Sequence, residues 1–107
     1  MVKSYNFTKK DEINSVSATP LQKVKNEILN VSGAAITTRT DEETQEERQV
    51  GLLATDKGTF SSISATAIKG LDLIIDYMEE EQVQNVQVKV NSSKSNAGRE
   101  FITLELV

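Results

Sequence analysis

The chain has 107 residues and a net charge of −4, from 16 acidic and 12 basic side chains. It contains neither cysteine nor histidine, which excludes disulfides, thiolate metal sites, cysteine nucleophiles and histidine-based catalytic triads. The length predicts one domain. No stretch reaches the roughly 20 apolar residues of a membrane span, and the N-terminus lacks the apolar run of a signal peptide. We therefore expect a soluble, cytoplasmic protein.

Residues 1–27 are predicted to form an N-terminal extension that is partly flexible or contains one short helix. Tyr5 and Phe7 alternate with polar residues, which fits either a short edge strand or a flexible terminus. Thr19-Pro20 has the form of a helix start. That helix either continues for ten residues or stops after one or two turns, before a strand that begins near Glu27. The shorter helix is favoured, because the residues that follow are mostly β-prone.

Three strands are predicted next. The first covers residues 28–40, and Gly33 within it indicates a bulge or a sharp bend. An acidic loop separates it from a mostly apolar strand over residues 49–55. Asp56-Lys57-Gly58 then forms a tight turn, in which the glycine is available for a positive φ. A short third strand follows over residues 59–63.

One helix is predicted over residues 65–81, with Ser64 as its N-cap. Its apolar residues recur at intervals of three and four, which is the pattern of a helix lying on a core; they include Ile68, Leu71, Ile75 and Met78. Gly70 interrupts this pattern, and an interior glycine costs about 1 kcal/mol relative to alanine. We therefore expect Gly70 to pack closely against a neighbouring backbone.

Two strands follow the helix. Residues 83–90 place Val86, Val88 and Val90 on one face, and a polar loop over residues 91–98 leads to a last strand over residues 99–107.

The order of three strands, a helix and two strands is that of the OB-fold. We expect a mostly β protein with one helix, in which residues 28–107 form a five-stranded Greek-key barrel with the helix between strands 3 and 4. A sandwich with an open sheet and the same strand order would give nearly the same pattern.

Enzymatic activity is not expected, because the candidate catalytic groups lack a suitable partner base. Neither a metal nor a cofactor is expected. The acidic loop, residues 41–47, has carboxylates that could bind a hard cation, but their spacing matches no EF-hand loop. A solvated hairpin tip is the preferred interpretation. Its five acidic residues are Asp41, Glu42, Glu43, Glu46 and Glu47.

Binding of single-stranded nucleic acid has more support. OB barrels hold single strands on one face of the barrel and on two of its loops, where bases stack on aromatic rings and basic side chains follow the phosphates. The residues that could form this surface are Phe60, Arg39, Lys57, Lys89, Lys94, Arg99 and Phe101. For each there is an alternative: Phe60 could fill the barrel, Phe101 could belong to a second small core, and single lysines are often only solvated.

The segments 54–64 and 73–76, together with 86–90 and 93–106, resemble the single-stranded DNA-binding proteins of protein-primed Bacillus phages and related Firmicutes phage proteins. These segments include Ala54-Thr55-Asp56-Lys57-Gly58-Thr59-Phe60 and Ser93-Lys94-Ser95-Asn96-Ala97-Gly98-Arg99. The likeness covers about residues 28–107. It implies an OB-like fold and a protein that coats displaced single strands during phage DNA replication, in the host cell cytoplasm, with replication proteins as candidate further partners.

The resemblance also implies base stacking by tyrosines on the binding face. Phe60 lies at or beside one such position, whereas Thr37, Thr38 and acidic residues stand near the others. Each stacked base contributes about 1–3 kcal/mol, so this departure implies binding that is weak, cooperative or lost. Two alternatives remain open: an OB-fold protein–protein interaction module that uses the acidic loop, or an acidic DNA mimic of phage origin.

Overall fold

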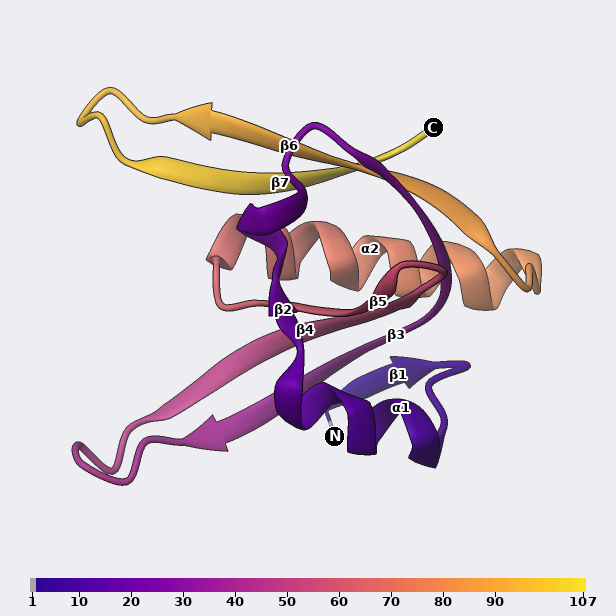
Figure 1. Ribbon diagram of the computed structural model, residues 1–107, viewed down its shortest axis with the longest axis horizontal. Helices are drawn as coiled ribbons and strands as arrows, with labels where there is room; N and C mark the ends of the chain where they lie inside the picture. Colours follow the sequence, from indigo (N-terminus) through magenta and orange to yellow (C-terminus); the bar gives the residue numbers. More distant parts are fainter. Residues whose placement is uncertain (1) are drawn as a thin grey trace.

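The structure is a computed structural model that describes residues 2–107, and Met1 lies outside the described residues. Strands dominate, accompanied by two α-helices and two short 3₁₀ turns (Figure 1). In chain order the elements are β1 (Lys3–Tyr5), α1 (Lys9–Asn14), η1 (Ser15–Ser17), β2 (Thr19–Pro20), η2 (Leu21–Val24), β3 (Ile28–Thr40), β4 (Glu47–Thr55), β5 (Gly58–Ser62), α2 (Ala65–Glu81), β6 (Val86–Lys94) and β7 (Glu100–Leu106).

All strands belong to one curled sheet in the order β2-β5-β4-β3-β6-β7, and β1 also pairs with β3. The five predicted strands are confirmed in sequence order as β3 to β7, with the long helix between the third and the fourth. The short helix α1 was not predicted as a second helix of the fold. Within residues 2–107, β5 and β7 do not pair. The sheet is therefore a curled half-barrel, and the closed barrel is not observed.

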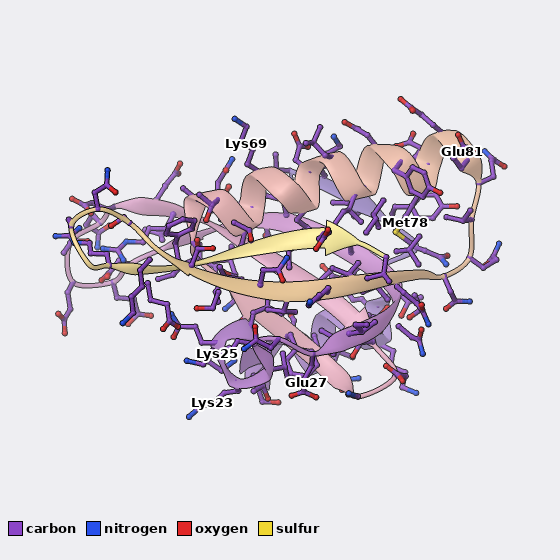
Figure 2. All side chains as sticks on the ribbon, turned by 90° about the horizontal axis from the view of Figure 1, so that it is seen from above. Lys23, Lys25, Glu27, Lys69, Met78 and Glu81 are labelled. Carbon is purple, nitrogen blue, oxygen red and sulfur yellow. The ribbon has the colours of Figure 1, made fainter. Side chains whose placement is uncertain are left out.

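Helix α2 packs in the concavity of the sheet, where it covers the outer edge of β7. Its apolar stripe is buried, and Figure 2 shows Met78 directed toward the strands while Lys69 points away. A Cβ on Gly70 would lie 3.7 Å from both the backbone nitrogen and the carbonyl oxygen of Leu104, so the helix contacts the backbone of β7 at this residue, at a distance that an alanine would also allow. The Thr66 hydroxyl donates to the Ile102 carbonyl oxygen at 2.7 Å. The edge that would pair with β5 in a barrel is thus occupied by a helix.

The bend predicted at Gly33 is confirmed. The register between β3 and β4 shifts between Val31 and Gly33. A Cβ on Gly33 would lie 2.3 Å from the carbonyl oxygen of Asn6, so a larger residue cannot be accommodated there without backbone movement. The bend divides β3 into a first half that pairs with β6 and a second half that pairs with β1.

The segment before β3 packs on the sheet. β1 is antiparallel to β3 and β2 is parallel to β5. Leu21 lies in the main core on the concave side, whereas Phe7 packs on a small convex-side cluster of Ala35, Val50 and Leu52.

The helix predicted to begin at Thr19-Pro20 does not continue for ten residues. Those two residues form β2, and the turn that follows, η2, ends at Val24. The shorter alternative is therefore the observed one. The domain boundary predicted at residue 28 stays a prediction, and the strands before it, β1 and β2, pair with β3 and β5. Ser64 is the N-cap residue of α2, as predicted, but its hydroxyl bonds to the Thr66 hydroxyl at 2.9 Å instead of capping a backbone amide.

Candidate nucleic-acid interface

Two long hairpins project from the same side of the molecule (Figure 1). We call them the β3–β4 arm, residues 37–50, and the β6–β7 arm, residues 92–102. The tip of the second arm turns at Gly98, whose φ of 80° favours glycine. The loop that leads into α2, residues 62–64, lies between the bases of the two arms in Figure 1.

The β3–β4 arm carries two arginines side by side. Arg39 and Arg48 are direct partners in the antiparallel register, so their side chains leave the sheet on the same face. Like charges in this position are destabilising by about 0.2–1 kcal/mol relative to neutral pairs. The nearest carboxylate to Arg48 is that of Glu46, at 3.9 Å and exposed to solvent. The pair lies on the face of the arm that carries Val50 and Leu52, opposite to the face of Ile36. It is an exposed cationic site whose repulsion an anion would relieve.

The β6–β7 arm combines cations with an aromatic ring. Lys94 lies opposite Glu100, and Phe101 lies opposite Ser93, so Lys94 and Phe101 face opposite sides of the arm. Arg99 is exposed at the tip and Phe101 is partly exposed. Glu100 also contacts the ammonium of Lys25 at 3.5 Å.

Two cavities lie between the arms and share one wall residue, Ile63. The first has a volume of about 630 Å³ and is enclosed by β1, the β3–β4 arm and the first turns of α2. The second, about 550 Å³, is enclosed by η2, β5 and the base of the β6–β7 arm, and Phe101 lines it. Ile63 is 66% exposed, which is unusual for an isoleucine. The two cavities adjoin at Ile63, and we call them together the cleft.

The first cavity combines aliphatic walls with polar and charged residues, among them Asp72 and Gln49. Its aliphatic walls are Val2, Ile36, Ile63 and Ile68, and its basic residues are Lys3, Arg48 and Lys69. Lys3 contacts Asp72 at 2.6 Å and Asp76 at 2.5 Å. The hydrogen bonds to Asp72 and then Asp76 raise the pKa of Lys3. Lys3 therefore stays charged at neutral pH, and on the alkaline side the ion pairs that join β1 to α2 persist until the pH rises above the ordinary lysine range.

Phe60 does not lie where the sequence led us to expect it. It is a direct partner of Leu53, and both side chains lie in the main core, where Phe60 is only 5% exposed. In this structure its ring packs in the core and offers no face to a base. The aromatic ring beside the cleft is that of Phe101.

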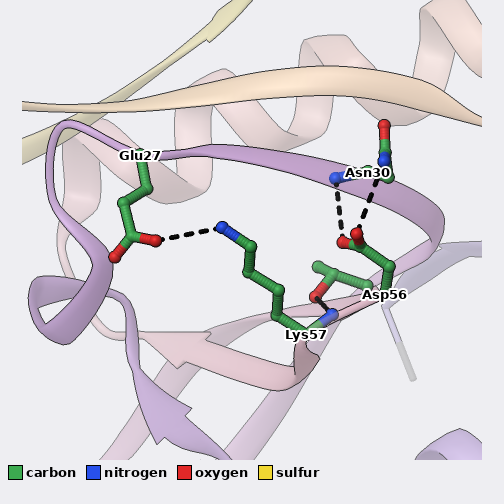
Figure 3. A network of polar contacts seen from close by, with 5 residues as sticks. Glu27, Asn30, Asp56 and Lys57 are labelled. Atoms are coloured by element: carbon green, nitrogen blue, oxygen red, sulfur yellow. Dashed lines mark hydrogen bonds and ion pairs between the residues drawn. The ribbon is translucent and has the colours of Figure 1, made fainter.

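Two of the predicted basic residues lie away from the arms. Lys57 is in the β4–β5 turn at the opposite end of the sheet from the arm tips (Figure 1). Its ammonium contacts Glu27 at 3.0 Å, while the neighbouring Asp56 accepts hydrogen bonds from Asn30 (Figure 3). Lys89 lies in the middle of β6 on the face opposite to the buried valines, with Glu105 as its direct partner. The structure therefore groups Arg39, Lys94, Arg99 and Phe101 on the arms and separates Lys57 and Lys89 from them.

The acidic loop forms the tip of the β3–β4 arm. The amide of Asp41 donates to the Glu46 carbonyl oxygen at 2.9 Å, and the Asp41 carboxylate accepts from the amide of Glu43 at 2.8 Å. Within residues 2–107, no group of three or more acidic side chains is placed to hold a metal ion. Five carboxylates thus stand directly beyond the arginine pair.

Sequence reasoning missed three residues of the cleft: Arg48, Ile63 and Lys69. Arg48 follows the acidic loop, and only the hairpin register places it opposite Arg39. Ile63 is a single apolar residue between two serines at a strand end, which could have indicated an exposed position. Lys69 lies on the polar face of the helix and is brought to the cleft by the way α2 crosses the sheet.

A curled sheet with cationic arms beside an apolar cleft suits a protein that binds an extended anionic polymer. The family model described as phage single-stranded DNA-binding protein, of the Phi29 phage type, matches residues 3–107. The chain belongs to this family, whose members are DNA-binding proteins without enzymatic activity. The match includes the N-terminal residues that the sequence resemblance left out. No curated protein and no solved structure matches the chain. In residues 2–107, no helix is long and apolar enough to cross a membrane.

Proposed function

We propose that the cleft between the two arms holds single-stranded DNA without reading its sequence. The observation that carries the proposal is that two apolar cavities meet at Ile63 and lie between arms that carry unpaired or weakly paired cations. A single strand presents phosphates along one side and apolar base faces along the other, so it needs this combination of groups. A duplex keeps its bases stacked inside and cannot use the apolar cleft.

The phosphates would be held mainly by the arms. Arg39 and Arg48 supply two guanidinium groups on one face of the β3–β4 arm, and a bound phosphate would remove their mutual repulsion. Arg99 and Lys94 supply the second cationic end. Because these side chains are exposed, binding should weaken steeply as the salt concentration rises.

The bases would lie against Phe101 and Ile63. Phe101 is half-buried beside the second cavity, so its ring is held in place while one face stays accessible. Stacking on a ring depends little on base identity, which makes the binding independent of sequence.

The fold itself is proposed to be an open relative of the OB-fold. The order of β3, β4 and β5, then α2, then β6 and β7, and the pairing of β3 with both β4 and β6, follow that fold. Helix α2 and the added strand β2 would replace the pairing that closes the barrel. In replication of phage DNA, such a protein would coat strands exposed in the host cytoplasm and work beside other replication proteins.

Fluorescence anisotropy with a labelled oligo(dT) and with a duplex of the same length tests this function. We expect binding of the single strand at low salt, a linear fall of log K with log salt concentration, and much weaker binding of the duplex. The double variant Lys94→Gln/Arg99→Gln should lose affinity, whereas Lys57→Gln should not, because Lys57 pairs with Glu27 away from the arms. Equal binding of duplex and single strand, or no binding at low salt, would overturn the proposal.

A further inference from the structure

One of the two cavities of the cleft has no aromatic ring in its wall. Phe101 lines the second cavity, but the first cavity has no aromatic residue among its lining residues and is larger. Its aliphatic residues come from three separate parts of the chain: Val2 just before β1, Ile36 on β3, and Ile63 and Ile68 around the start of α2. At about 630 Å³ it falls in the usual size range of small-molecule sites.

The rim of this cavity carries two cations that an anion could contact. The Lys3 ammonium is already paired with two carboxylates, those of Asp72 at 2.6 Å and Asp76. The other basic residues on the rim are Arg48, whose guanidinium lies 3.9 Å from the exposed Glu46 carboxylate, and Lys69.

The walls are also held in place before any ligand arrives. The Lys3 ion pairs fasten β1 to α2, and Gly51 lets β4 approach the helix so closely that an added Cβ would lie 2.9 Å from the Leu71 side chain. Gln49 contributes a carboxamide that can both donate to and accept from a polar edge. Aliphatic walls, one adaptable amide and two basic residues at the rim match a nucleobase joined to a phosphate.

We propose that the first cavity receives one unstacked nucleobase of the bound strand, with the adjoining phosphate between Arg48 and Lys69. This proposal rests on the proposed function, because the strand reaches the cavity along the cleft at Ile63. It assigns the two cavities different tasks: one base is inserted among aliphatic side chains in the first, while another stacks on Phe101 at the second. The protein would then hold two bases at fixed positions on opposite sides of Ile63.

Isoleucine methyl NMR tests insertion directly, because the ring current of a base shifts only the methyl groups that it approaches. On addition of oligo(dT) we expect the δ1 methyl resonances of Ile36, Ile63 and Ile68 to shift. Ile13 on α1 and Ile28 at the start of β3 lie outside both cavities and serve as controls within the same spectrum. Shifts confined to Ile63 would mean that the strand passes over the mouth without entering, and would overturn the proposal.

A second measurement uses a variant that fills the cavity. Ala65 is exposed at the first position of α2 and lines the first cavity, so Ala65→Leu should reduce the affinity for oligo(dT) at least about fivefold, the lower limit for one lost base contact. Leu73→Ala changes a similar apolar volume on the same helix outside both cavities, and should leave affinity unchanged. Thermal unfolding of both variants checks that they fold. If Ala65→Leu binds like the parent protein while Lys94→Gln/Arg99→Gln binds weakly, insertion fails and the proposed function stands. If the parent protein does not bind, both fail.

Discussion

The two arms of this protein have the same architecture and opposite charge patterns. Each is an antiparallel hairpin that extends beyond the core on the same side of the molecule (Figure 1). In the β6–β7 arm, opposite charges face each other as Lys94 and Glu100. In the β3–β4 arm, two arginines face each other below a tip with five carboxylates. A hairpin selected only for stability would not place two arginines side by side.

The difference indicates a division of work. The β6–β7 arm has no cross-strand pair of like charges, and it carries the partly exposed ring of Phe101, so it is suited to hold bases beside the cations Lys94 and Arg99. The β3–β4 arm is electrostatically strained and is suited to hold phosphates. The following changes act on one arm at a time.

Removing the aromatic ring from the β6–β7 arm should have the largest effect. Phe101→Ala removes the stacking surface, which is worth about 1–3 kcal/mol, or roughly 5- to 150-fold in affinity. Phe101→Tyr keeps the ring and should bind normally, whereas Phe101→Leu keeps apolar bulk without the ring and should bind weakly. Anisotropy titration with oligo(dT) measures all three. Equal affinity of the leucine and tyrosine variants would show that Phe101 contributes only packing.

Neutralising the arginine pair should weaken binding while stabilising the fold. Arg39→Gln/Arg48→Gln removes two phosphate contacts, so the slope of log K against log salt concentration should become shallower by about 1.4, at roughly 0.7 for each contact on a single strand. The free energy of unfolding should rise by about 0.2–1 kcal/mol, because the cross-strand repulsion is lost.

Urea unfolding and a salt series measure these two effects, and Lys57→Gln is the matched control. The Lys57 ammonium is paired with Glu27 at the other end of the sheet. Lys57→Gln should therefore show neither the shallower salt slope nor the higher free energy of unfolding expected for the double arginine variant. If the salt slope of the double arginine variant is unchanged, the β3–β4 arm is not part of the binding surface.

Neutralising the acidic tip should have the smallest effect and the opposite sign. Replacing Asp41 with Asn, and Glu42, Glu43, Glu46 and Glu47 with Gln, removes repulsion between the tip and the phosphates. Affinity for oligo(dT) should rise severalfold at low salt and converge with that of the parent protein at high salt, where the Debye length is only a few ångströms. A loss of affinity instead would mean that the tip supports the arm rather than repelling the strand.

Much of the local structure could be predicted from the sequence. The period of the apolar residues located α2, and Gly33 and Gly58 marked the bulge and the turn that the structure contains. Gly70 indicated a close backbone contact, although not that β7 would supply it. These features depend on residues near one another in the chain, so their pattern is visible in one dimension.

The candidate site was predicted only in part for the same reason. Arg39, Lys94, Arg99 and Phe101 were expected at a binding surface and do lie on the arms, but Phe60 is in the core. Both faces of β5 carry few apolar residues. The alternation of apolar and polar residues in this five-residue strand therefore did not show whether the Phe60 ring points into the core or toward solvent. Arg48 and Lys69 were missed because only the hairpin register and the placement of α2 bring them beside the cleft.

The sequence by itself determined the strands, the long helix, their order, and the family to which the chain belongs, because periodicity and local motifs are properties of neighbouring residues. Tertiary structure decided that the sheet remains open, that α2 covers the edge of β7, and that two cavities meet at Ile63. These features depend on how segments far apart in the chain pack against each other. Which element covers a strand edge, and which residues line a cavity, cannot be found from the pattern of neighbouring residues.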